Sequence, residues 1–106
     1  MRRSNQDAYT FCDLDGGAVF AAVCDGMGGA NGGNVASNLA VKTLGDRITG
    51  NWRKNMEPKS IYNALMSAVS AANLTVFDKA AGDEQLSGMG TTVVAAIIFG
   101  DTAYVI

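Results

Sequence analysis

The fold of this chain is decided by the stretch VFAAVCDGMGG, residues Val19 to Gly29. A short apolar run rich in β-branched and aromatic residues stops at Asp25 and gives way to glycines. This pattern predicts a buried strand that carries the Asp25 carboxylate at its tip. The glycines lack a Cβ, so backbone can pass close to whatever the carboxylate binds. The stretch therefore predicts a metal or phosphate site at the end of a strand.

Length and composition indicate one folded domain. The chain has 106 residues, of which 48% are apolar and 17% are charged, as in globular proteins. A net charge of −2 provides no electrostatic basis for binding nucleic acid or an anionic membrane. No apolar run reaches the roughly 18 residues that span a bilayer, and the polar N-terminus does not resemble a signal peptide. We expect a cytoplasmic protein without nucleic-acid or membrane partners.

Cysteine and histidine counts restrict the chemistry. Two cysteines, Cys12 and Cys24, do not make a disulfide framework and are expected to be reduced. The chain has no histidine, which excludes the Ser-His-Asp and Cys-His nucleophile systems and every zinc site that uses histidine. Carboxylates, arginines, hydroxyls and backbone groups remain for any chemistry.

Two strand-like segments surround a Gly-Gly pair near the N-terminus. Residues 8–13 and 18–24 are predicted to form a β-hairpin with Gly16 and Gly17 as a two-residue loop. This register places Asp7 opposite Gly26, at the same end of the hairpin as Asp25. Strict alternation then puts the two aspartates on opposite faces, so we expect their convergence to require a bend at the glycines.

The remaining chain alternates between helical and strand patterns. A first helix is expected from Asn34 to Ile48, capped by Asn31 or Asn34 and ended by Gly50. A second helix is expected from Pro58 to about Ala81, with Gly82 past its end. A loop over 82–88 precedes a strand over 91–99 that is apolar on both faces and expected to be covered on both. A last strand covers 102–106.

Asp25, Asp7 and Arg2 are the strongest candidate site residues. Hard cations such as Mg²⁺ and Mn²⁺ prefer carboxylate and carbonyl oxygens, so Asp25 and the Gly26 carbonyl could form part of a cage. A nearby arginine suits phosphate recognition. Alternatives to these roles stay open. The aspartates could be turn or cap residues, and Arg2 could be an ordinary solvated side chain. Thr91 and Thr92 could have only a structural role. The glycine loop lacks the Walker and dinucleotide-binding spacings, so a nucleotide-binding module is the least supported reading.

Several motifs in register resemble the PPM (type 2C) family of metal-dependent Ser/Thr protein phosphatases, in its bacterial branch. The matching motifs are Arg2-x-x-Asn5-Gln6-Asp7, Val23-Cys-Asp-Gly-Met-Gly-Gly29 with Gly33-x-x-Ala36-Ser37, Ala72-Asn73, Gly88-Met-Gly-Thr-Thr92 and Ala103-Tyr104-Val105.

The resemblance implies an α+β fold: part of a PPM-type β-sandwich of antiparallel strands with two packed antiparallel helices. It also implies two Mn²⁺ or Mg²⁺ ions. Asp25 would bridge them, the Gly26 carbonyl would bind one, Asp7 would act through water in the outer shell, and Arg2 would bind the phosphate of a phosphoprotein substrate. A metal-activated water would hydrolyse phosphoserine or phosphothreonine.

Departures from the family pattern qualify this expectation. Gln6 replaces the usual acidic residue, and Met27 occupies the place of a histidine general acid in the eukaryotic branch, as in many bacterial members. The family domain continues past position 106 to further metal-binding aspartates. Residues 1–106 are therefore expected to be the incomplete N-terminal portion of a phosphatase domain, weakly active or inactive alone. The alternative is a non-catalytic binding or regulatory domain that forms homo-oligomers through exposed strand edges.

Overall fold

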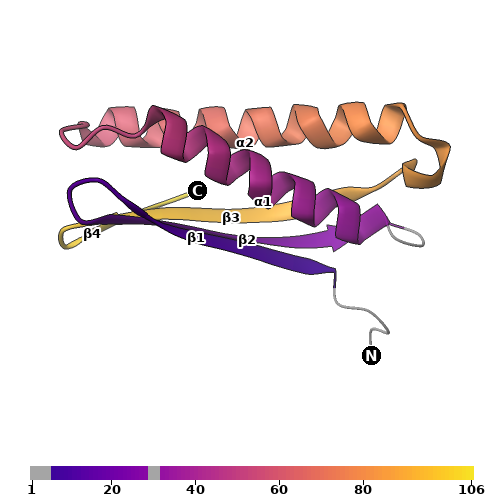
Figure 1. Cartoon of the computed structure of the whole chain (residues 1–106), viewed down its shortest axis with the longest axis horizontal. Helices are drawn as coiled ribbons and strands as arrows, with labels where there is room; N and C mark the ends of the chain where they lie inside the picture. Colours follow the sequence, from indigo (N-terminus) through magenta and orange to yellow (C-terminus); the bar gives the residue numbers. More distant parts are fainter. Residues whose placement is uncertain (1–5, 29–31) are drawn as a thin grey trace.

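The computed structural model describes residues 6–28 and 32–106. Within these ranges the chain forms an antiparallel sheet in the order β1-β2-β3-β4, with two long antiparallel helices together on one side of it (Figure 1). The predicted α+β class is confirmed. Of the two sheets that a sandwich needs, the described residues form one. The elements in chain order are β1 (Asp7–Leu14), β2 (Ala18–Met27), α1 (Gly32–Asn51), α2 (Pro58–Ala81), the short 3₁₀ helix η1 (Glu84–Leu86), β3 (Gly90–Phe99) and β4 (Thr102–Val105).

The β1–β2 hairpin has a different register from the predicted one. Leu14 pairs with Ala18, so the loop contains three residues, Asp15 to Gly17, and the prediction of a two-residue loop is wrong. Gly16 and Gly17 both have positive φ, 81° and 82°, a region that favours glycine. The longer loop shifts every pair by one residue. Asp7 consequently lies directly opposite Asp25 and not opposite Gly26, and the two aspartates share a face without any bend.

Helix α1 is longer than predicted, because it begins at Gly32 and continues through Gly50 to Asn51. Asn34 lies inside the helix and does not cap it, while Asn31 lies outside the described residues. The buried side of α1 consists largely of small residues that let the helix approach the sheet closely. Its buried members are Gly32, Gly33, Ala36, Ser37, Ala40, Val41, Leu44 and Ile48.

Helix α2 confirms the predicted bounds. Pro58 occupies the first turn, where its missing N–H costs no hydrogen bond, and the N–H of Gly82 donates to the Asp78 carbonyl just past the helix end. No helix in the described part of the chain combines the length and the apolarity that crossing a membrane requires. The buried residues of α2 are Ile61, Leu65, Ala68, Ala72 and Val76.

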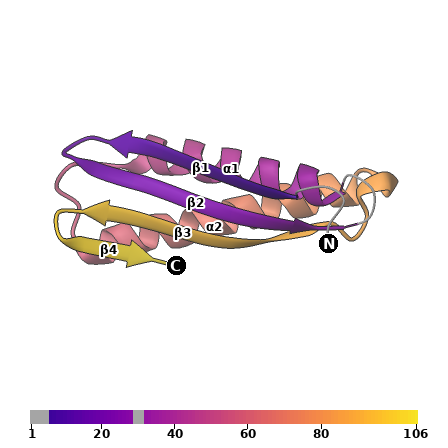
Figure 2. The same cartoon turned by 90° about the horizontal axis from the view of Figure 1, so that it is seen from below.

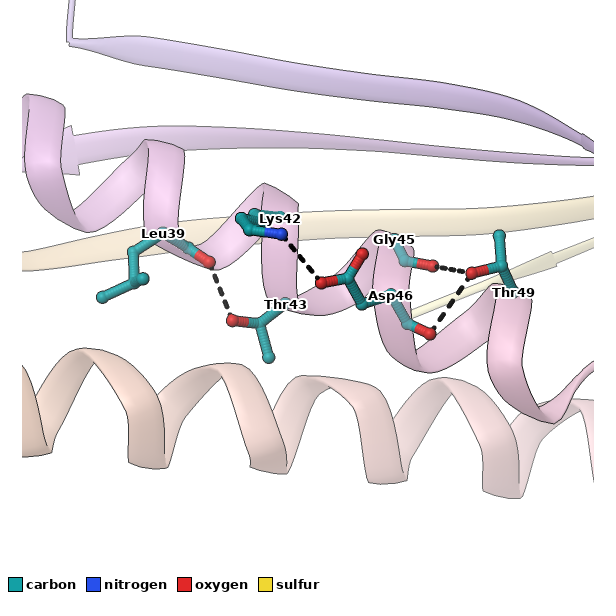
Figure 3. A network of polar contacts seen from close by, with 6 residues as sticks. All are labelled: Leu39, Lys42, Thr43, Gly45, Asp46 and Thr49. Atoms are coloured by element: carbon teal, nitrogen blue, oxygen red, sulfur yellow. Dashed lines mark hydrogen bonds and ion pairs between the residues drawn. The ribbon is translucent and has the colours of Figure 1, made fainter.

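Polar contacts on α1 are local. The Lys42 ammonium contacts the Asp46 carboxylate at 3.1 Å across one helical turn, and the hydroxyls of Thr43 and Thr49 donate to carbonyls of the preceding turn (Figure 3). Both charged side chains are well exposed, so solvent screens the pair and it contributes at most a few tenths of a kcal/mol, ~0.3–0.5. Packing therefore determines where α1 lies.

The sheet presents one side to the helices and leaves the other bare, as Figure 2 shows from below. In β3, Ala95 and Ile97 are buried under the helices, whereas Val94 and Ile98 are exposed. The prediction that this strand is covered on both faces is therefore wrong for the described residues. We call the bare side the open face. Its large exposed apolar residues are Tyr9, Phe11, Val23, Met27, Val94, Ile98 and Val105.

Candidate metal centre

Three neighbouring strands place polar side chains in one row across the end of the sheet. Asp7 of β1 pairs with Asp25 of β2, which in turn pairs with Thr92 of β3. Directly paired residues have their Cβ atoms about 4.5–5.5 Å apart on the same face. The backbone of the hairpin and of β3 therefore brings together the two carboxylates that the sequence selected.

Asp25 lies inside β2, two residues before its end at Met27, so the prediction that it is the tip of the strand is wrong. The pairing of β2 with β3 continues past it to Met27 and Gly90. The Asp25 N–H donates to the Thr92 hydroxyl at 3.2 Å, and this hydroxyl donates to the Asp25 carbonyl at 3.5 Å. Thr92 thus holds the backbone that carries the half-buried Asp25 side chain. The sequence left open whether Thr92 offers its hydroxyl to a site or is structural, and its observed contacts with the Asp25 backbone are structural.

Gly26 is required by close backbone contacts. Its N–H donates to the Gln6 carbonyl at 3.0 Å, and a Cβ at this position would overlap the carbonyl of Gly33 in the first turn of α1. The absence of a side chain therefore lets β2 and α1 meet directly behind the aspartates. The close backbone approach at Gly26 is thus to α1 and to Gln6, whereas the predicted approach to a group bound by the carboxylate stays a prediction.

A hollow of about 390 Å³ adjoins this corner, and residues that line it include Gln6, Asp25, Gly26 and Thr92. A larger hollow of about 630 Å³ lies between α2 and β3 and is lined mostly by apolar side chains such as Val76, Phe77 and Met89. Of these two hollows, the smaller one is lined by Asp25, and a hard cation needs oxygen donors of this kind.

The donors at this corner suit a hard cation in type but are few in number. Asp25 and Asp7 supply carboxylates and Gly26 a carbonyl, which are ligands that Mg²⁺ and Mn²⁺ prefer. Across residues 6–28 and 32–106, no three His, Cys, Asp or Glu side chains are placed to share one metal ion. The described residues therefore fit part of one cation shell and do not by themselves form a two-metal centre.

Cys24, next to Asp25, belongs to the core. It is fully buried on the helix side of the sheet, and both it and Cys12 are free thiols, as predicted. Burial raises the pKa of the Cys24 thiol, and a hydrogen bond with the Thr91 side chain partly opposes the shift. Burial and the Asp13 carboxylate raise the pKa of Cys12. Both thiols therefore stay protonated near neutral pH. Arg2, the predicted phosphate ligand, lies outside the described residues.

Comparison with known proteins agrees with the fold. A family model described as protein phosphatase 2C matches residues 2–106. The serine/threonine phosphatase stp of Listeria monocytogenes is 35% identical over 101 residues, which are 92% of this chain and 38% of that protein. The chain thus spans about 40% of the length of this relative and of a similar streptococcal protein.

Two solved structures also match nearly all of this chain, which covers less than half of each of them. The serine/threonine phosphatase of S. agalactiae superposes with a TM-score of 0.86 at 28% identity, covering 99% of this chain and 42% of that one. The catalytic domain of the phosphatase PstP, solved in complex with two manganese ions, superposes with a TM-score of 0.76 at 28% identity and covers 99% of this chain and 41% of that one. From the matched family model and these likenesses, the chain belongs to the protein phosphatase 2C family.

Proposed function

We propose that these 106 residues are the N-terminal portion of a metal-dependent protein phosphatase domain that acts on phosphoserine and phosphothreonine of protein substrates. Membership of a family whose relatives are named serine/threonine phosphatases supports this function. The single structural observation that carries it is the register that sets Asp7 opposite Asp25, beside a hollow with the Gly26 backbone.

Each residue of the corner has a role in the proposal. Asp25 binds a Mn²⁺ or Mg²⁺ ion through its carboxylate, Gly26 through its carbonyl oxygen, and Asp7 through an intervening water. Such an ion, when bound, lowers the pKa of a coordinated water and polarises a phosphoryl oxygen. Thr92 is a positioning residue that fixes the Asp25 backbone. The role of Arg2, whose planar guanidinium matches two phosphate oxygens, rests on its sequence motif alone.

We expect the 106-residue chain by itself to bind metal weakly and to hydrolyse phosphate esters slowly or not at all. Metal affinity in oxygen cages depends on the number of charged ligands, and this corner offers two carboxylates. The scarcity of ligands also favours a second candidate, a non-catalytic binding domain that associates through exposed strand edges. The outer edge of β1 is one such edge of the sheet.

Manganese titration of the purified chain and its variants tests the proposed site. Asp25→Asn should weaken Mn²⁺ binding at least about tenfold, since even outer ligand contacts carry factors of ~10–100, and Asp7→Asn should weaken it less. Asp13→Asn is the matched control, because Asp13 lies on the same face of β1 near the opposite end of the hairpin.

Hydrolysis of p-nitrophenyl phosphate with Mn²⁺, measured on the same proteins, separates activity from binding. Turnover that Asp25→Asn abolishes would contradict the expected inactivity and would support the metal site. Equal Mn²⁺ affinity of Asp25→Asn and the unsubstituted chain would refute the site and leave the binding-domain candidate.

A further inference from the structure

Three segments of backbone meet beside the candidate metal corner: the end of β2, the start of α1 and the segment that leads into β3 (Figure 1). Gly26 of β2 lies directly against the Gly33 carbonyl of α1. The third segment contributes Met89, which directly precedes β3 and is only 8% exposed. Met89 is therefore a buried side chain at the junction of these three segments.

Met89 lies beside two glycines that belong to different segments. A Cβ added at Gly28 would be 3.1 Å from the Met89 Cα, and a Cβ added at Gly32 would be 3.2 Å from the Met89 Cβ. Carbon atoms that are not bonded attract each other most strongly at about 3.5–4.0 Å, so neither glycine has room for a methyl group unless Met89 moves. Gly28 follows the end of β2 and Gly32 begins α1. Met89 thus packs against both elements that form the corner.

Other contacts hold Met89 in place. Its N–H donates to the Leu86 carbonyl at 3.1 Å, and this turn passes through Gly88, whose φ is 80°. Leu86 of η1 is buried to the same extent as Met89, and both belong to the main core. The turn and the core therefore fix Met89 independently of the two glycines, so that it can support them.

We propose that Met89 is a positioning residue for the metal corner, and that it holds the end of β2 against the start of α1. The inference rests on the proposed function of this corner, because Gly28 lines the same hollow as Asp25 and Gly26. Met89 itself lines the larger, apolar hollow. It therefore acts on the corner through Gly28 and Gly32 and not as a ligand.

Gly32→Ala tests this contact from the side of α1. Gly32 lies in the first turn of α1 and does not have a positive φ, and alanine by itself suits a helix better than glycine. The added methyl group would press on Met89 and shift the junction. The dissociation constant for Mn²⁺ should rise about tenfold, as it does when residues that orient metal ligands are changed. Gly50→Ala is the matched control in the same helix, because its methyl group would meet no atom of another element within 4 Å.

Substitutions of Met89 test the contact from the other side. Met89→Gly removes the Cβ that the new methyl group would meet, so the effects of Gly32→Ala and Met89→Gly on the Mn²⁺ dissociation constant should be less than additive in free energy. Met89→Leu keeps the Cβ and a similar volume and should bind Mn²⁺ as the unsubstituted chain does.

Leu14→Ala separates positioning from general stability. Leu14 is 8% exposed, as Met89 is, but it adjoins the hairpin loop at the opposite end of β1 from Asp7. Its truncation should lower the urea midpoint, as truncation of a buried leucine does, and leave the Mn²⁺ dissociation constant unchanged. Met89→Gly should change both quantities.

Two results would overturn the proposal: Mn²⁺ affinity of Gly32→Ala equal to that of Gly50→Ala, or effects of Gly32→Ala and Met89→Gly that simply add. Circular dichroism establishes that each variant is folded. If Gly32→Ala does not fold, Met89→Gly alone decides, since it removes the support without adding a methyl group. An unchanged Mn²⁺ dissociation constant in Met89→Gly would then refute the role of Met89.

NMR spectra of the metal-free chain distinguish this inference from the proposed function. If the unsubstituted chain binds Mn²⁺ no better than Asp25→Asn does, the proposed function fails. The amide resonances of Asp25 and Gly26 then test Met89. They should shift in Gly32→Ala and return toward their original positions when Met89→Gly is added, whereas unchanged resonances would show that Met89 does not position the corner.

Discussion

At the scale of single residues, the local structure at Gly26 depends on the absence of a side chain. Its backbone lies between the Gln6 carbonyl and the start of α1, and a Cβ would overlap the Gly33 carbonyl oxygen. Backbone atoms cannot rotate away as a side chain can, so the two elements would have to separate.

We predict that Gly26→Ala lowers the free energy of unfolding by about 1–3 kcal/mol, the usual cost of overpacking. Urea denaturation followed by circular dichroism measures the change. Gly50→Ala is the control, because a methyl group at this position of α1 would meet no atom of another element within 4 Å and alanine suits a helix. An unchanged midpoint for Gly26→Ala would show that β2 and α1 do not meet as closely as described.

The types of residue in the sequence were enough to select Asp7 and Asp25. The position of one aspartate relative to the other, however, depended on the length of the hairpin loop. A Gly-Gly pair is compatible with both a two-residue and a three-residue hairpin loop, and one residue of difference reverses which face each side chain occupies. The structure has the longer loop, in which the Trp52 indole N–H donates to the Asp15 carbonyl at 2.8 Å. This contact comes from 37 positions away in the sequence, and local pattern cannot anticipate it.

At the scale of elements, the ends of a helix were predicted correctly where the sequence has residues that terminate helices. The prediction failed where packing against the rest of the molecule determines the end of the helix. Pro58 and Gly82 fixed both ends of α2 from sequence alone. Helix α1 continues through Gly50 to Asn51. A glycine lowers helix propensity but does not by itself terminate a helix. Its small residues Ala36 and Ala40 are buried while Val35 and Leu39 are only half-buried, so the size of apolar residues did not indicate the packed side.

We predict that Gly45→Ala stabilises the chain by about 0.5–1 kcal/mol, the gain of replacing glycine inside a helix. Gly45 lies within α1, and an added Cβ would contact only the Thr10 hydroxyl, at an ordinary 3.7 Å. Thermal unfolding measures the change. Gly16→Ala is the opposite control and should destabilise, because Gly16 has a φ of 81°. A loss of stability in Gly45→Ala would mean that α1 lies nearer to β1 than this distance allows.

At the scale of the whole molecule, one core joins the sheet to both helices. The fully buried side chains of Phe20 and Ile97 from the sheet, Leu44 from α1 and Leu65 from α2 belong to a single cluster. The sequence could not show that this core uses only one side of the sheet, because β3 is apolar on both. Apolar strand faces indicate that something covers them, and the pattern does not specify whether it is this chain or another surface.

We predict that Leu44→Ala lowers the free energy of unfolding by about 2–5 kcal/mol, a large part of the ~5–15 kcal/mol of a typical domain. Leu44 is completely buried and belongs to the shared core, so the substitution leaves a cavity in that core. Leu74→Ala is the matched control: Leu74 is 59% exposed on α2, and its change should stay within about 0.5 kcal/mol.

Urea denaturation at one fixed protein concentration, followed both by circular dichroism and by Trp52 fluorescence, makes the measurement. Trp52 packs edge-on against Phe99 of β3, with ring centroids 5.9 Å apart, and therefore reports on the sheet, while circular dichroism reports mainly on the helices. Because the two layers share one core, both signals should shift together in Leu44→Ala. If the helical signal shifted and Trp52 did not, the helices and the sheet would be separate cooperative units, and the position of Asp25 would not depend on helix packing.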